Sequence, residues 1–352
     1  MSITIALAGN PNCGKSTLFN ALTGSNQYVG NWPGVTVEKK GGVYKKDKEV
    51  NITDLPGIYS LSPYTLEEVV SREYLINEKP DVIVDVIDAS NIERNLYLAT
   101  QLSEIGIPMV LALNMMDVVE KNGDKIDTDK LSQEFGYPVV EISALRGKNI
   151  DKVIEVAKQV AGRKHEVVNV YDEKLEKVLS DIEASAGCLA NSDYKRWYAV
   201  KLFEKDTKAT EKLELSSVER NNIDEIIARA EEDFDDDGEG IITDARYTYI
   251  TDVVARTVSK GRAGLTTSDK IDKYVTSRLF ALPIFAALMF LIYYVAVTVV
   301  GGPVTDWVNE DFFGDIIGGN VGSMLEGAGV APWVKSLVVD GIIGGVGGVL
   351  GF

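Results

Sequence analysis

A glycine-rich segment near the amino terminus constrains the fold more than any other part of the sequence. Its residues are Gly9-Asn10-Pro11-Asn12-Cys13-Gly14-Lys15-Ser16. An apolar run over residues 3–8 precedes it, and Thr17 opens a stretch that favours a helix. A strand, such a loop and a helix form a unit in which backbone N–H groups face phosphate oxygens. We expect Lys15 to contact the β- and γ-phosphates of a nucleotide and Ser16 to offer a hydroxyl to Mg²⁺.

Short apolar runs alternate with amphipathic stretches up to about residue 160. The candidate strands are residues 3–8, 50–53, 82–87, 109–113 and 139–142, and helical patterns include 95–105 and 127–135. This alternation predicts a parallel sheet with helices on both faces, and ligands that bind beyond the carboxyl ends of the strands. The predicted fold class for residues 1–165 is therefore an α/β, Ras-like phosphate-loop domain.

Two motifs are expected to hold the magnesium ion and the γ-phosphate. The first is Asp54-Leu55-Pro56-Gly57, which follows the second candidate strand. Asp54 suits the Mg²⁺ shell, and the N–H group of Gly57 can contact the γ-phosphate. The second is the loop Gly30-Asn31-Trp32-Pro33-Gly34-Val35-Thr36, which we interpret as a switch loop that closes on the ligand. Thr36 is the candidate for a second hydroxyl on Mg²⁺.

The base is predicted from two further motifs. Asn114-Met115-Met116-Asp117 follows the fourth candidate strand, and Ser143-Ala144-Leu145 follows the fifth. The Asp117 carboxylate can accept hydrogen bonds from N1–H and the 2-amino group of guanine, and the Ala144 N–H can meet guanine O6. Adenine lacks both donors at that edge, so it would leave the carboxylate unpaired. The four motifs predict GTP rather than ATP.

The predicted nucleotide-binding residues extend over all four motifs and the switch loop. They are Gly9, Asn10, Pro11, Asn12, Cys13, Gly14, Lys15, Ser16, Thr17, Gly34, Val35, Thr36, Asp54, Leu55, Pro56, Gly57, Asn114, Met115, Asp117, Ser143, Ala144 and Leu145. Ser16, Thr36 and Asp54 are the predicted Mg²⁺ ligands.

Two positions depart from the commonest small-GTPase pattern. Ile58 stands where many GTPases carry a glutamine that orients the attacking water, and Met115 replaces a lysine whose alkyl stem covers the guanine. We therefore expect slow hydrolysis and loose nucleotide binding with quick exchange.

Helical periodicity without strand signals marks residues 166–265. Apolar residues recur at helical spacing over 170–185, 193–204 and 217–233, which predicts a small helical domain; a simple spacer is the alternative. The run Asp233-x-Asp235-x-Asp237-Gly238, ending at Asp244, imitates a calcium loop. Gly240 and Asp244 do not suit positions eight and twelve, so a solvated acidic linker is favoured.

An uncharged segment of 22 residues, 279–300, is long enough to cross a bilayer as a helix. We predict a linker helix over 266–278, a first membrane span over 279–302, an extracytoplasmic loop over 303–336 and the start of a second span over 337–352. The glycines of the predicted second span recur at four-residue spacing, which favours close helix packing. The charges flanking the first span place residues 1–278 in the cytoplasm by the positive-inside rule. They are Lys270, Lys273 and Arg278 before it, and Asp306, Glu310, Asp311 and Asp315 after it.

Charge and metal-ligand residues exclude several functions. The net charge is −17 without a basic stretch, which argues against nucleic-acid binding. Cys13, Cys188 and His165 show no zinc-site or disulfide spacing. Cys13 is interpreted as a small filler of the phosphate loop, with a redox-sensitive thiol as the alternative.

Several segments resemble the prokaryotic ferrous-iron transporter B (FeoB) family. They are the four motifs, residues 30–38, Asn91-Ile92-Glu93-Arg94-Asn95-Leu96-Tyr97, Asp244-Ala245-Arg246-Tyr247, Lys270-Ile271-Asp272 and Gly344-Gly345-Val346-Gly347-Gly348-Val349-Leu350. The resemblance implies a GTPase domain, a helical domain that strengthens GDP binding, and a multi-pass pore in the inner membrane of a prokaryote. It also implies that Asn12, with help from Asn31, coordinates K⁺ in place of an arginine finger. The predicted catalytic residues are then Lys15, Asn12, Thr36 and Gly57.

The resemblance makes Fe(II) the transported ion, handled by a pore region beyond residue 352. Small accessory Feo proteins, membrane lipid and a second copy of the chain are the other candidate partners. Two alternatives stay open: a membrane-anchored regulatory G protein that transports nothing, and a related transporter for another divalent metal such as Mn(II). No soft or imidazole ligand cluster in the sequence supports iron independently of the resemblance.

Overall fold

The computed structural model describes residues 2–32, 35–163, 169–190, 192–211, 213–261, 275–277 and 280–350. It contains two units, Met1–Ala263 and Gly264–Phe352. Gly34, Lys270, Lys273, Arg278, His165 and most of the predicted linker helix over 266–278 lie outside the described residues.

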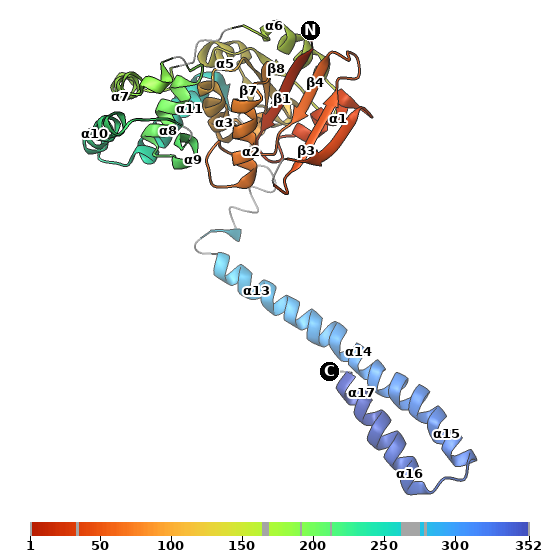
Figure 1. The fold of residues 1–352 in the computed structure, drawn as a ribbon. Helices are drawn as coiled ribbons and strands as arrows, with labels where there is room; N and C mark the ends of the chain where they lie inside the picture. Colours follow the sequence, from red (N-terminus) through yellow and green to blue (C-terminus); the bar gives the residue numbers. More distant parts are fainter. Residues whose placement is uncertain are drawn as a thin grey trace. The chain divides into compact units, whose positions relative to one another are not determined.

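The first unit is built around a seven-stranded sheet in the order β2-β3-β4-β1-β5-β6-β8 (Figure 1). Its strands are β1 (Ile3–Gly9), β2 (Gln27–Asn31), β3 (Glu38–Val43), β4 (Val50–Asp54), β5 (Val82–Asp88), β6 (Met109–Asn114) and β8 (Val139–Glu141). β1 pairs in parallel with β4 and β5, and β6 pairs in parallel with β5 and β8. These five strands match the predicted strands, because each is short, apolar and mostly buried. β7 (Lys125–Ile126) and β9 (Val258–Ser259) form a separate antiparallel pair.

The sequence did not predict the two antiparallel strands at one edge of this sheet. β3 pairs with β4, and β2 pairs with β3. Every residue of β2 is exposed, and β3 contains Lys39, Lys40, Gly41 and Gly42, so neither strand carries an alternating apolar pattern. The sheet is therefore mostly, not wholly, parallel. Asn31 is the last residue of β2 and lies opposite Glu38.

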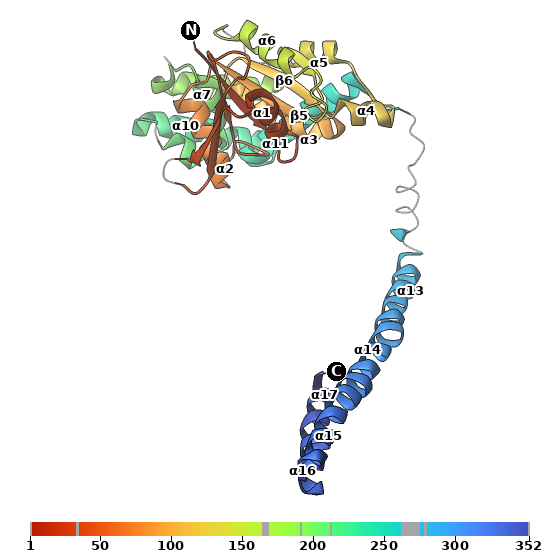
Figure 2. The same ribbon diagram turned by 90° about the vertical axis from the view of Figure 1, so that its right-hand side faces the viewer.

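Helices cover both faces of the sheet (Figure 2). The residues of β1 divide between them: Ile5 and Leu7 belong to the core beneath α1 and α6, and Ala6 and Ala8 belong to the core beneath α2, α3 and α5. The helices are α1 (Lys15–Thr23), α2 (Leu66–Asn77), α3 (Ile92–Glu104), α4 (Met116–Asn122), α5 (Thr128–Phe135) and α6 (Ile150–Val160), with a 3₁₀ turn at Ala89–Asn91. This arrangement confirms the predicted phosphate-loop fold class.

A group of helices follows in the same unit. They are α7 (Glu173–Ser185), α8 (Lys195–Phe203), α9 (Thr207–Thr210), α10 (Ser217–Phe234) and α11 (Gly238–Thr257), with a 3₁₀ turn at Gly187–Leu189. Leu179, Phe203, Ile227 and Ile242 are in their shared core. They form a helical domain with its own hydrophobic centre, and α11 also contributes Ile250 to the core of the sheet.

The acidic stretch after α10 is a capped turn between two helices. Asp235 adopts a left-handed conformation at the end of α10, and the Asp237 carboxylate accepts a hydrogen bond from Gly240 N at 2.8 Å. The second half of the calcium-like pattern, residues 238–244, is thus the start of α11 and not a loop that could surround an ion. The interpretation of this stretch as a linker missed α11. Within the described residues no group of three or more metal-ligating side chains comes together.

A buried ion cluster joins α11 to α3. Arg246 donates to Glu104 at 2.9 Å and to Glu204 at 2.9 Å, and its side chain is 1% exposed. Beside it, the rings of Tyr97 and Tyr247 stack with centroids 5.0 Å apart. Two of the segments that carry the family resemblance therefore meet at the contact between the helical domain and the GTPase fold.

The second unit contains two helices that are long and apolar enough to cross a membrane, Ala281–Gly327 and Pro332–Leu350. The labelled elements are α13 (Ala281–Tyr294), α14 (Gly302–Asp306), α15 (Asn320–Gly327), α16 (Pro332–Ser336) and α17 (Gly344–Leu350), joined by π-helical stretches at Val295–Gly301, Trp307–Gly319 and Leu337–Ile343. Most of the predicted loop over 303–336 is therefore helical. The extracytoplasmic location of this stretch stays a prediction.

A glycine lets the two helices of this unit pack closely. A Cβ atom at Gly347 would lie 2.8 Å from the Cβ of Phe313, so a side chain there would force the helices apart. At the turn between the helices, Lys335 pairs with Glu326.

Candidate nucleotide-binding site

The phosphate loop is held in a conformation that glycine makes possible. Gly14 has a φ of +91°, and a Cβ atom on it would lie 2.2 Å from the side-chain nitrogen of Asn114. α1 begins at the next residue, Lys15. The first N–H groups of this helix therefore face the end of the sheet where β1 and β6 stop, as an anion site requires.

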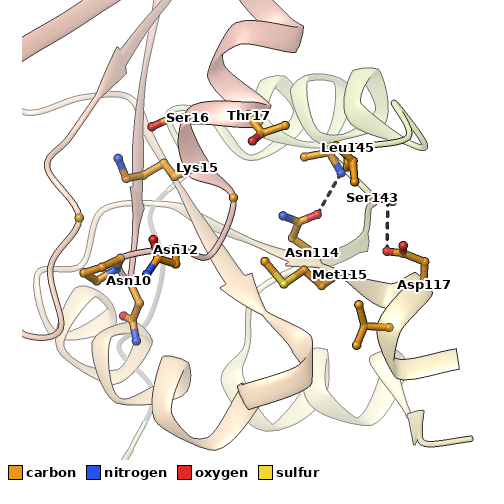
Figure 3. A pocket seen from close by; sticks show the side chains of 15 residues that line it. Asn10, Asn12, Lys15, Ser16, Thr17, Asn114, Met115, Asp117, Ser143 and Leu145 are labelled. Atoms are coloured by element: carbon orange, nitrogen blue, oxygen red, sulfur yellow. Dashed lines mark hydrogen bonds between the residues drawn. The ribbon is translucent and has the colours of Figure 1, made fainter. Parts of the chain in front are cut away.

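A cavity of about 740 Å³ lies at this end of the sheet (Figure 3). Its lining comes from the phosphate loop, the end of β6, α4, the loop after β8 and Gly57. The lining residues are Asn10, Pro11, Asn12, Gly14, Lys15, Ser16, Thr17, Gly57, Asn114, Met115, Asp117, Val118, Ser143, Ala144 and Leu145. The volume lies within the range of small-molecule sites. Of these residues, Val118 was not predicted from the sequence.

Asn114 ties the two ends of the cavity together. Its side-chain nitrogen donates to the carbonyl oxygen of Cys13 at 2.8 Å, and its side-chain oxygen accepts from Ala144 N at 2.9 Å. Asn114 is buried, so both bonds are shielded from water. The loop expected under the phosphates and the loop expected beside the base are thus fixed relative to each other.

The base end of the cavity carries the Asp117 carboxylate (Figure 3). Its Oδ1 accepts from the Ser143 hydroxyl at 3.3 Å, and its Oδ2 lies 3.2 Å from a guanidinium nitrogen of Arg146. Met115 adopts a left-handed φ of 62° before α4. The sequence reasoning missed Arg146, although it follows the Ser143-Ala144-Leu145 motif directly.

The phosphate end contains an ion pair between two predicted site residues. Lys15 Nζ lies 2.5 Å from Asp54 Oδ1, and Lys15 also donates to the Leu55 carbonyl oxygen. Both side chains are less than one-tenth exposed. A phosphate group for Lys15 and a hydrated divalent cation for Asp54 would replace this pair with two new charge contacts.

Some predicted residues do not line the cavity. The cavity lining does not include Gly9, Cys13, Asp54, Leu55 or Pro56. Asn31 is at the end of β2, and Val35 and Thr36 lie in the loop that joins β2 to β3. Thr36 and Asn31 are exposed. The closure of the switch loop onto a ligand therefore stays a prediction.

Cys13 of the phosphate loop and Ile58, which follows Gly57, are both buried in the hydrophobic core. Cys13 is 1% exposed, and burial raises the pKa of its thiol to about 12. A thiol that stays protonated is a poor nucleophile, which favours the filler interpretation over a redox role. Ile58 is 2% exposed within the core beneath α2 and α3, so its side chain cannot orient a water molecule.

Comparison with known proteins agrees with this geometry. The family model described as ferrous iron transport protein B matches residues 3–157, and the FeoB cytosolic helical domain model matches residues 171–259. A solved GDP-bound mutant of the S. thermophilus FeoB G-domain is 47% identical, with a TM-score of 0.71, over 73% of this chain and 100% of that chain. S. thermophilus NFeoB bound to GDP.AlF4⁻ and K⁺ is 48% identical, with a TM-score of 0.66, over 71% of this chain and 98% of that one.

One curated relative extends beyond these two domains. The Fe(2+) transport protein A/Fe(2+) transporter FeoB fusion protein of Porphyromonas gingivalis is 36% identical over 99% of this chain. This chain covers 42% of the relative, so it spans less than half of that protein's length.

The sheet, the phosphate loop and the cavity together define a phosphate-loop GTPase that is followed by a helical domain. With these matches, the chain belongs to the ferrous iron transport protein B (FeoB) family.

Proposed function

We propose that this chain is the GTP-binding and GTP-hydrolysing cytosolic part of a membrane transporter for Fe(II), together with its first membrane helices. The observation that carries the GTP assignment is the single cavity that joins the phosphate loop to Asp117 through Asn114. The Fe(2+) transporter relative supports iron as the cargo. No observation favours the regulatory G protein or the Mn(II) transporter.

The proposal assigns a role to each part of the chain. Residues 1–165 hydrolyse GTP, residues 166–265 relay the nucleotide state, and the segments from 279 onward enter the inner membrane, with residues 1–278 in the cytoplasm. The buried Arg246–Glu104 contact supports a relay, because it couples α11 to α3 directly. The P. gingivalis fusion of transport protein A with FeoB supports a small accessory Feo protein as a partner.

The residues of the cavity fit a magnesium nucleotide. Ser16 and Thr17 are exposed into it, and the Asp54 carboxylate lies directly behind Lys15. Hydroxyl and carboxylate oxygens are ligands that Mg²⁺ accepts, so Ser16, Asp54 and, after loop closure, Thr36 would hold it. Asn12 is exposed in the cavity and its amide oxygen suits K⁺, with Asn31 as the second candidate. These ions supply positive charge against the phosphoryl charge that develops during hydrolysis.

The chain's own groups position the phosphates, but the residue after Gly57 is an isoleucine and not the glutamine that many GTPases use to orient water. Lys15 and the N–H groups at the start of α1 stabilise negative charge, and the N–H group of Gly57 is available to the γ-phosphate. Ile58 is buried and apolar, so it cannot orient the attacking water. The proposed consequence is a slow reaction that depends on a bound cation.

GTP turnover by the detergent-solubilised chain should be about tenfold or more faster in KCl than in NaCl of equal concentration. Asn12→Ala should lose most of this difference, because the amide oxygen that would hold K⁺ is removed. Phosphate release is the measurement. Asn222→Ala, at an exposed position of α10, is the matched control. Equal wild-type rates in the two salts would overturn the K⁺ proposal.

GDP should bind with a dissociation constant of about 1 µM or weaker and should exchange quickly. Met115 lacks the long charged stem that usually covers the base, and Asp117 must give up its contact with Arg146 before it binds the 2-amino group of guanine. Titration with a fluorescent GDP analogue, followed by displacement with unlabelled GDP, measures both quantities. A nanomolar constant contradicts this expectation.

A further inference from the structure

The carboxylate expected to recognise guanine already has a cationic partner. Asp117 Oδ2 lies 3.2 Å from Arg146, while Oδ1 accepts the Ser143 hydroxyl. In the part of the chain that the structure describes, Asp117 is the only ion-pair partner of Arg146. The Arg146 side chain is 68% exposed, so its position is not imposed by packing.

A closed turn holds Arg146 beside Asp117. Ser143 and Lys148 form a β-bridge, with Ser143 N to Lys148 O at 3.2 Å and Lys148 N to Ser143 O at 3.1 Å. Gly147, which follows Arg146, has a φ of +67°. Because both ends of this short loop are fixed, Arg146 is presented at the base end of the cavity.

The two carboxylate oxygens have different partners, and the two donors of guanine would meet them differently. A hydroxyl can rotate, and a carboxylate oxygen can accept more than one hydrogen bond, so Ser143 can remain while one oxygen accepts N1–H. The remaining oxygen, Oδ2, lies beside the planar Arg146 guanidinium, which would compete there with the 2-amino group. A base without a 2-amino group could bind while the Arg146 pair persists.

We propose that Arg146 competes with the 2-amino group of guanine for Asp117 and so weakens guanine binding selectively. This inference rests on the proposed binding of guanine nucleotides at Asp117. In this role Arg146 is a specificity-determining residue that reduces the preference for guanine over hypoxanthine and speeds the release of GDP. An exposed ion pair of this kind corresponds to a change in affinity of about threefold to fivefold.

The test compares GDP with inosine diphosphate, which lacks only the 2-amino group. Dissociation constants for both are measured by calorimetry with wild type, Arg146→Ala and Arg146→Lys in detergent. Arg146→Ala should tighten GDP binding about threefold to fivefold and leave inosine diphosphate nearly unchanged. The dissociation constant of inosine diphosphate divided by that of GDP should therefore rise by the same factor. Arg146→Lys, which keeps the charge, should restore part of the wild-type ratio.

The ratio separates competition from other effects of the charge. A general attraction of Arg146 for phosphate would change both dissociation constants by the same factor, and their ratio would stay the same. Arg229→Ala, at an arginine on α10 whose side chain is 77% exposed, makes the same change of charge far from the cavity and should not alter the ratio. An unchanged ratio in Arg146→Ala overturns the inference alone. Failure of the wild type to bind GDP would overturn the proposed function as well.

Discussion

Asp117→Asn should convert the pocket from guanine to xanthine nucleotides. The aspartate presents two acceptors to the two donors of guanine, whereas an asparagine presents one acceptor and one donor. Xanthine has a carbonyl oxygen in place of the 2-amino group, so it matches the asparagine and mismatches the aspartate. We expect the variant to lose about 100-fold or more in affinity for GTP, because a buried donor is left unpaired at the base edge.

The measurement is competition of GTP and XTP for a fluorescent nucleotide, with both proteins in the same detergent. The variant should bind XTP more tightly than GTP, and the wild type should show the reverse order. Asp129→Asn, at an exposed position of α5, makes the same chemical change away from the cavity and should behave as wild type. A variant that keeps full GTP affinity would show that Asp117 does not contact the base.

Asp85→Asn should stabilise the fold, and more so as the pH rises. Asp85 is 1% exposed on β5, its Oδ2 has no hydrogen-bond partner among the described residues, and burial raises its pKa to about 7. Between the usual carboxyl pKa of 3.8 and about 7, the folded protein holds a proton that the unfolded chain has lost. Stability therefore falls with rising pH over this window and levels off above it.

Asparagine has nearly the same shape and carries no charge, so it removes this dependence. The difference in unfolding free energy between variant and wild type should widen by about 2 kcal/mol from pH 5.5 to pH 7.5. Urea unfolding at a series of pH values measures it. Asp224→Asn, at an exposed position of α10, should give a constant difference. A gap that does not change with pH would mean that Asp85 finds a partner or water in solution.

The sequence predicted the parts of the fold whose burial leaves a pattern. The five parallel strands are apolar and buried, and the motif residues follow from their positions at the strand ends. β2 could not be found because all its residues are exposed, and its place in the sheet depends on pairing with β3. α11 was missed because an acidic run precedes it and its first turn contains Gly238 and Gly240, a composition that resembles a linker.

The sequence motifs predicted most of the side chains that line the cavity, but not the contacts of these side chains with one another. Lys15 and Asp54 were expected to bind different parts of a ligand, and the structure pairs them with each other. Arg146 reaches Asp117 because the turn after Ser143 folds back on itself, and residue spacing alone does not encode that closure.

The double hydrogen bond of Asn114 has a consequence for fidelity. A base that does not seat against Ala144 would disturb Asn114 and, through the Cys13 carbonyl, the loop beneath the phosphates. A nucleotide with the wrong base would then bind more weakly, and once bound it would also be cleaved more slowly because its phosphates are misaligned. We expect ATP, which has an amino group in place of the 6-carbonyl oxygen that meets Ala144, to be cleaved more slowly than GTP even at saturating concentrations. Such an enzyme would hydrolyse little of a nucleotide with the wrong base and would not need a separate editing step.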